Sequence, residues 1–100
     1  MTYEKALELK NAGYEQFPDN WKGEYLDDSS GWGTHQVYVP ILEELIEACN
    51  LNGGVFSEIR LQEGKYVAIG YHNKKDIYKI EIAKKPKEAV ANLWLALNKK

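Results

Sequence analysis

The stretch Val55–Ala83, VFSEIRLQEGKYVAIGYHNKKDIYKIEIA, decides the fold. It holds three runs, residues 55–61, 65–71 and 77–82, in which successive side chains alternate as they do along a β-strand. The pair Glu63–Gly64 marks a tight turn after the first run, and the polar segment 72–76 marks a second turn. Because connections this short join antiparallel neighbours, the sequence predicts a three-stranded antiparallel meander.

The same alternation predicts which side chains of each strand share a face. In the last strand we expect Tyr78, Ile80 and Ile82 to point toward the core, and Ile77, Lys79 and Glu81 to point away from it. In the middle strand, Val67, Ile69 and Tyr71 form the matching apolar row. The alternation in the first strand places four side chains on one face: Val55, Ser57, Ile59 and Leu61.

Two amphipathic helices flank the predicted sheet, over about residues 40–50 and 86–98. Each begins at a proline, Pro40 or Pro86, whose fixed φ suits the first helical position. Apolar side chains then recur at helical spacing in both segments. We expect both helices to pack on one face of the sheet, around a core of ten residues: Leu42, Leu45, Ile46, Val67, Ile69, Ile80, Val90, Leu93, Trp94 and Leu97.

The N-terminal third is predicted to hold a short helix over residues 2–12, capped by Thr2 and ended by Gly13. Its apolar face comprises Tyr3, Ala6, Leu7 and the stem of Lys10, and Leu9 lies off this stripe. An irregular aromatic loop follows at about residues 14–36. Val37–Val39 or Trp21–Leu26 would add a fourth strand. The predicted class is therefore α+β: one domain over residues 1–100, with a three- to four-stranded antiparallel sheet and helices on one face.

Composition sets limits on function. The chain has 100 residues, one cysteine and a net charge of −2, which excludes a disulfide framework and argues against a nucleic-acid partner. Residues 64–100 nevertheless hold nine lysines against three acidic residues. The N-terminus has no secretory signal, and the longest apolar run, Leu93–Leu97, is far too short to cross a membrane. We expect a cytoplasmic protein.

Two segments carry a family resemblance: YVPILEELIEAC at residues 38–49 and EAVANLWLALNKK at residues 88–100. Together with Tyr66–Val67–Ala68 they resemble a family of small uncharacterised proteins encoded by tailed phages and prophages. Lys85 stands where that family often has a capping threonine, a difference worth about 1 kcal/mol of helix capping. The resemblance covers about the last two-thirds of the chain. It implies a phage or prophage setting inside a bacterial host cell, and it carries over no activity.

The predicted binding residues lie in the aromatic loop: Trp21, Tyr25, Trp32 and His35. Tryptophan and tyrosine provide large contact area at low entropic cost, and loops on a rigid scaffold often bind partners. The alternative is that these rings fold back to cap the core. Cys49 lies on an apolar helix stripe among acidic residues, so we expect a structural thiol. The sequence assigns no catalytic residue, metal site or cofactor.

Three functions remain open. The first is a non-enzymatic phage or prophage accessory protein that binds an unknown host or phage protein. The second is a small-ligand binder or enzyme that uses the loop at residues 21–35. The third is a nucleic-acid accessory protein that uses the C-terminal lysines with Tyr66, Tyr71 and Tyr78. The absence of a catalytic motif favours the first, and the sequence leaves the oligomeric state open.

Overall fold

The computed structural model describes residues 1–16, 22–27, 36–51 and 53–98. The chain forms two compact units, residues 1–41 and residues 42–100, and each is described by itself. The first unit comprises α1 (Tyr3–Asn11), β1 (Glu24–Asp27) and β2 (Gln36–Val39). The second comprises α2 (Leu42–Cys49), β3 (Gly54–Gln62), β4 (Lys65–His72), β5 (Ile77–Ala83) and α3 (Pro86–Asn98). The predicted α+β class and the three-stranded antiparallel meander are confirmed.

The additional strands form a sheet of their own. β1 and β2 pair antiparallel with each other, with Tyr25 opposite Tyr38, and they make a two-stranded sheet separate from β3–β4–β5. Strand β1 lies within the segment that the sequence predicts to be an irregular loop. The remainder of that loop, residues 17–21 and 28–35, lies outside the described residues.

Helix α1 is closed at both ends by local hydrogen bonds. The Thr2 hydroxyl accepts from the Lys5 amide (3.2 Å), as predicted for a cap. At the other end, Gly13 has φ +98° and its amide donates to the Lys10 carbonyl, while the Tyr14 amide donates to the Leu9 carbonyl. This pair of bonds is a Schellman motif, in which an apolar residue after the glycine typically packs near the helix end.

The predicted apolar face of α1 is wrong for one pair of residues. Leu9 is buried and Lys10 is exposed. The buried face therefore runs through Ala6 and Leu9, one helical turn apart, and it is extended by buried Tyr14 after the motif. The core of this unit includes Ala6, Val37 and Val39, with Met1, Tyr3, Leu7 and Leu26 packed around them.

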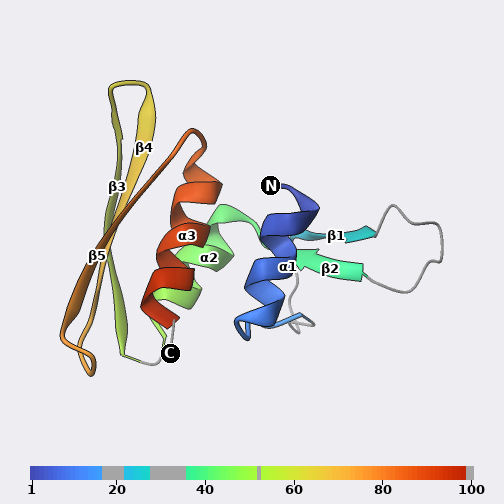
Figure 1. Ribbon diagram of the computed structural model, residues 1–100, viewed down its shortest axis with the longest axis horizontal. Helices are drawn as coiled ribbons and strands as arrows, with labels where there is room; N and C mark the ends of the chain where they lie inside the picture. Colours follow the sequence, from blue (N-terminus) through green and yellow to red (C-terminus); the bar gives the residue numbers. More distant parts are fainter. Residues whose placement is uncertain (17–21, 28–35, 52, 99–100) are drawn as a thin grey trace. The chain divides into compact units, whose positions relative to one another are not determined.

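In the second unit, the sheet has the strand order β3–β4–β5 (Figure 1). Glu63 and Gly64 both have positive φ, which gives the two-residue turn that the sequence predicts between Gln62 and Lys65. The β4–β5 register is regular over seven pairs, from Tyr66 opposite Ala83 to His72 opposite Ile77. Both hairpins thus follow the predicted antiparallel order.

Strand β3 contains a β-bulge. Phe56 lies opposite Gly70 and Glu58 lies opposite Ile69, so Ser57 is an extra residue without its own partner in β4. The bulge reverses the alternation, because side chains before and after it exchange faces. The predicted row of Val55 with Ile59 and Leu61 is therefore wrong: Val55 shares a face with Glu58 and Arg60 instead.

The helices pack on the face opposite to the one predicted for β5. A Cβ atom added at Gly70 would lie 3.0 Å from Leu93 Cδ2, so the face that carries Gly70 and Ala68 lies against α3. Ile80 is 52% exposed and lies on the other face, as the partner of Ile69. The small residues of β4 allow the close approach of α3, and a face of Ile69 and Val67 would not. The prediction that Ile80 belongs to the core is wrong.

The helix layer of this unit otherwise follows the predicted stripes. Helix α3 begins at Pro86 as expected, and Leu45, Val90, Leu93, Trp94 and Leu97 are buried, while Leu42 and Ile46 are half-buried. Helix α2 begins at Leu42, because Val39 still pairs in β2 and the residue before a proline favours extended backbone. Pro40 is thus not its first helical residue.

Candidate interaction surface

The most distinctive surface of the molecule is the side of the three-stranded sheet that faces away from α3. The register places seven apolar or aromatic side chains there, which we call the outer face: Val55, Val67, Ile69, Tyr71, Tyr78, Ile80 and Ile82. The central Val67 and Ile69 are buried between their neighbours, whereas Tyr78, Ile80 and Ile82 on β5 are 59%, 52% and 56% exposed. An antiparallel sheet with one solvated face usually carries polar residues there.

Charged side chains lie at the margins of this surface, on β3, at Lys65 where β4 begins, and at Asp76 beside the β4–β5 turn. Glu58 and Arg60 lie on the same side as the outer face and approach each other to 4.0 Å, although both are more than half exposed. Such an exposed pair contributes little to stability. The central parts of the β4 and β5 rows form a continuous apolar area between these charges, and contiguous exposed apolar patches on soluble proteins often mark interaction sites.

One hydrogen bond fixes the edge of the outer face near the β4–β5 turn. The Tyr71 hydroxyl donates to Asp76 Oδ1 over 2.8 Å. This hydrogen bond raises the pKa of Tyr71 above its usual value, with smaller contributions from desolvation and from the negative charge of Asp76. Tyr71 lies opposite Tyr78 in the register, so two phenol rings border the isoleucine rows.

The sequence does not predict this surface, because β5 has the alternation of an amphipathic strand with one apolar and one charged row. Tyr78, Ile80 and Ile82 are the more apolar row, and burial of the apolar row is the ordinary expectation. The signal that points the other way lies in β4, where Ala68 and Gly70 make one face small enough for a helix to approach. The bulge at Ser57 leaves no such signal in the sequence.

Of the four predicted binding residues, the structure describes only Tyr25. Its hydroxyl donates to the Gln16 carbonyl (2.7 Å), and its ring centroid lies 5.2 Å from that of Tyr38 at a tilted angle of 56°. Tyr25 is half-buried and its polar atom is engaged, so it packs within its own unit. Trp21, Trp32 and His35 lie outside the described residues.

A small polar network surrounds Tyr25 and Tyr38. The Gln16 side chain accepts from the Tyr38 amide (3.0 Å) and donates to the Tyr14 carbonyl (3.0 Å). The buried Tyr38 hydroxyl accepts from the Gly23 amide at 2.8 Å and the Lys22 amide at 3.2 Å. These bonds satisfy backbone groups next to the short sheet, which is a structural role.

Cys49 is buried at the end of α2, in agreement with the expected structural thiol. Burial raises its pKa from 9.0 to about 12, so the thiol is neutral at physiological pH and a poor nucleophile. His72 is also buried, and its Nδ1 accepts from the Lys75 amide (3.2 Å). Among the described residues, no three side chains of His, Cys, Asp or Glu are arranged to hold a metal ion.

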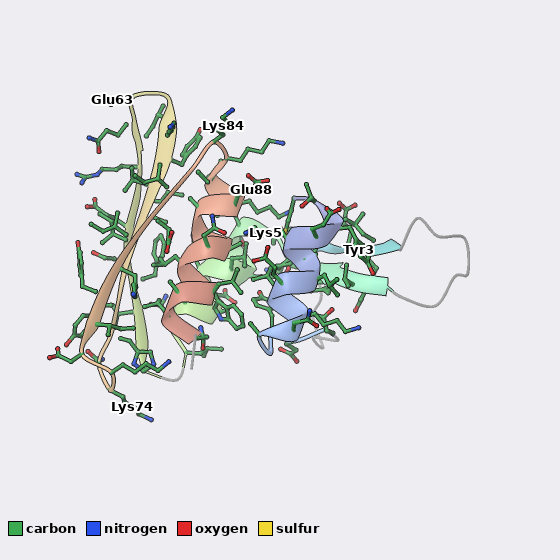
Figure 2. The ribbon with its side chains drawn as sticks, viewed as in Figure 1. Tyr3, Lys5, Glu63, Lys74, Lys84 and Glu88 are labelled. Carbon is green, nitrogen blue, oxygen red and sulfur yellow. The ribbon has the colours of Figure 1, made fainter. Side chains whose placement is uncertain are left out.

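Among the lysines that the structure describes in the C-terminal half, Lys74 and Lys84 lie at opposite ends of the sheet (Figure 2). Lys74 lies in the β4–β5 turn, and Figure 2 shows it at the opposite end of the sheet from Glu63. Lys75 is engaged within the unit, since its Nζ donates to the Leu97 carbonyl (2.9 Å) at the end of α3. Tyr66 lies on the helix-facing side of β4, away from Tyr71 and Tyr78.

None of the helices in the described part of the chain is long and apolar enough to span a bilayer. No family model matches the chain, and no curated protein or solved structure is significantly similar to it.

Proposed function

We propose that this chain is a non-enzymatic binding module that captures another protein on the outer face of its three-stranded sheet. The carrying observation is the exposure of Tyr78, Ile80 and Ile82 in one row on a regular strand. The setting is a phage or prophage accessory protein, on the strength of the resemblance in residues 38–49 and 88–100.

The chemistry of the outer face favours a protein partner. Isoleucine side chains offer dispersion contacts and hydrophobic burial, and tyrosine is among the residues that dominate protein interfaces. The charged neighbours of the β4 and β5 rows lie at the margins, with Glu58 and Arg60 on β3 and Lys65 at the start of β4. An apolar centre beside a polar rim is the usual anatomy of a protein interface.

Nucleic acid is less well matched to this surface. Binding to phosphates requires cationic side chains that track the backbone of the ligand. Here Lys74 and Lys84 lie at opposite ends of the sheet, and the hydroxyl of Tyr71 is bonded to an acidic residue, Asp76. The two tyrosines on the outer face provide stacking rings without a continuous basic track.

The test is affinity capture with chemical crosslinking from bacterial lysate, comparing the wild type with Ile80→Ser/Ile82→Ser. We expect the double variant to lose at least about tenfold of a specifically crosslinked protein, because two anchors of the apolar row are removed. On this chain, the residues crosslinked to the partner should lie in β4 and β5. Circular dichroism and a thermal melt establish that the variant is folded.

The matched control is Leu51→Ser/Leu61→Ser. Leu51 and Leu61 are 62% and 63% exposed, similar to the isoleucines, but they do not belong to the outer face. This control should retain the partner. Equal capture by all three proteins would overturn the proposal, as would a captured species that disappears on nuclease treatment, which would indicate nucleic acid.

A further inference from the structure

The two edges of the three-stranded sheet are built differently. β3 carries a bulge at Ser57, and its Phe56 amide is taken up by the Asn50 side chain (2.8 Å). β5 has no proline and no register shift against β4, and its outer row is exposed. Bulges, capping groups and unmatched charges protect a strand edge from pairing, whereas a regular edge whose charges a partner strand can match is a template for pairing. In the described part of the chain, β5 has a strand partner on one side only.

From this asymmetry we infer that β5 pairs antiparallel with β5 of a second copy of this chain, in a two-fold register centred on Ile80, to form a continuous six-stranded sheet. The inference goes beyond the proposed function, because it rests on the strand edge and does not depend on what binds the outer face.

Charge complementarity selects this register. In an antiparallel pair centred on Ile80, Lys79 of each copy lies opposite Glu81 of the other, and Tyr78 lies opposite Ile82. Centring the pair on Lys79 would place two lysines opposite each other, and centring it on Glu81 would do the same with two glutamates. Within the described residues, neither Lys79 nor Glu81 has an ion-pair partner.

The alignment of the faces agrees with the same symmetry. Directly opposed residues of an antiparallel pair point to the same side of the sheet. With Ile80 at the two-fold axis, the Tyr78, Ile80 and Ile82 rows of the two copies therefore join into one apolar stripe. Each row gains an apolar neighbour in place of solvent, which removes hydrophobic surface from water.

The helices leave room for this pairing. Helix α3 packs against both β4 and β5. With strands about 4.8 Å apart, two such helices would lie about 10 Å from each other across the new strand pair, which is an ordinary helix packing distance. The Lys79 and Glu81 side chains are on the helix-facing side of β5 and would lie between these helices and the sheet. Reduced exposure to water there makes a mismatch of charge costly.

The test is sedimentation equilibrium of the purified chain and its charge variants. The wild type should sediment as a dimer, with twice the chain mass of 11.5 kDa. Lys79→Glu and Glu81→Lys should each weaken the dimer about tenfold or more, because each places like charges opposite one another at two symmetric positions. The double variant Lys79→Glu/Glu81→Lys reverses both charges and should restore the dimer.

Lys65→Glu is the matched control, because Lys65 is exposed and begins β4, which lies on the side of β5 away from the proposed pairing. It should leave the dimer unchanged, and circular dichroism should show all variants folded. A monomeric wild type, dimers in both single variants, or failure of the double variant to recover would each overturn the inference. The charge variants leave every outer-face side chain in place, so partner capture by a monomeric Lys79→Glu protein would uphold the proposed function independently.

Discussion

The two faces of the β3–β4–β5 sheet are both largely apolar in β4, yet they are used in opposite ways. The inner face presents the small residues Ala68 and Gly70, on which α3 packs through Leu93. The outer face presents the larger Tyr78, Ile80 and Ile82, and these remain exposed. The difference teaches that side-chain size decided which face received the helix, because a helix needs close approach to the strands as well as apolar surface.

The strongest test of this comparison truncates one large side chain on each side. Leu93→Ala should lower the free energy of unfolding by about 3 kcal/mol, because Leu93 is fully buried and the site retains a cavity. At a concentration low enough for the chain to be monomeric, Ile80→Ala should cost less than about 1 kcal/mol, because half of its side chain is in solvent. Urea unfolding followed by circular dichroism measures both.

The comparison fails if Ile80→Ala costs as much as Leu93→Ala. That result would mean that the outer face is covered in solution. Measurement at several protein concentrations shows whether a dimer covers this face, because a dimer that buries Ile80 makes the unfolding midpoint depend on concentration. Leu61→Ala, which removes a similarly exposed side chain elsewhere, provides the reference for an uncovered position.

A smaller effect is expected from adding a methyl group under α3. Gly70→Ala should destabilise the protein by about 2 kcal/mol, because the new Cβ would approach Leu93 Cδ2 to 3.0 Å and the Val55 carbonyl oxygen to 3.1 Å. The double variant Gly70→Ala/Leu93→Ala should cost less than the sum of the two single changes. Strict additivity in this cycle would show that Gly70 and Leu93 are not in contact.

The strands, their antiparallel order and α3 could be predicted from local patterns. Alternation, the Glu63–Gly64 turn and Pro86 each have a local physical cause. The orientation of the sheet could not, because the alternation in β5 favours burial of Tyr78, Ile80 and Ile82, the row that remains exposed. It depends on how Gly70 meets Leu93, two residues far apart in the sequence.

The candidate site shows the same limit. The aromatic content of the predicted loop suggested a binding surface, but Tyr25 packs on Tyr38 and donates a hydrogen bond to Gln16 within the first unit. The sequence does not reveal the outer face, because its isoleucines have the spacing expected of core residues. The bulge at Ser57, which places Val55 beside this face, arises from pairing between strands and has no single-residue signature.

The smallest expected effect concerns two groups whose pKa is raised on the two sides of the sheet for different reasons. Burial raises the pKa of Cys49, in the helix layer, from 9.0 to about 12. The hydrogen bond to Asp76 is the main cause that raises the pKa of Tyr71, on the outer face. In both cases the unfolded chain loses its proton at lower pH than the folded one, so stability is complete below the unfolded pKa and declines as pH rises above it.

For Cys49 this decline begins near pH 9 and continues to about pH 12, with a loss of about 1 kcal/mol by pH 10. Urea unfolding of the wild type and Cys49→Ala at pH 8 and pH 10 isolates the effect, because the variant lacks this titration but shares every other one. From pH 8 to pH 10 the free energy of unfolding should fall more in the wild type than in Cys49→Ala. A thiol reagent should also label native Cys49 far more slowly than the urea-unfolded chain, since the buried thiol is neutral and shielded. Rapid labelling of the native protein, or parallel pH profiles for the two proteins, would contradict the burial of Cys49 and with it the tight packing of the helix layer that distinguishes the inner side of the sheet from the outer.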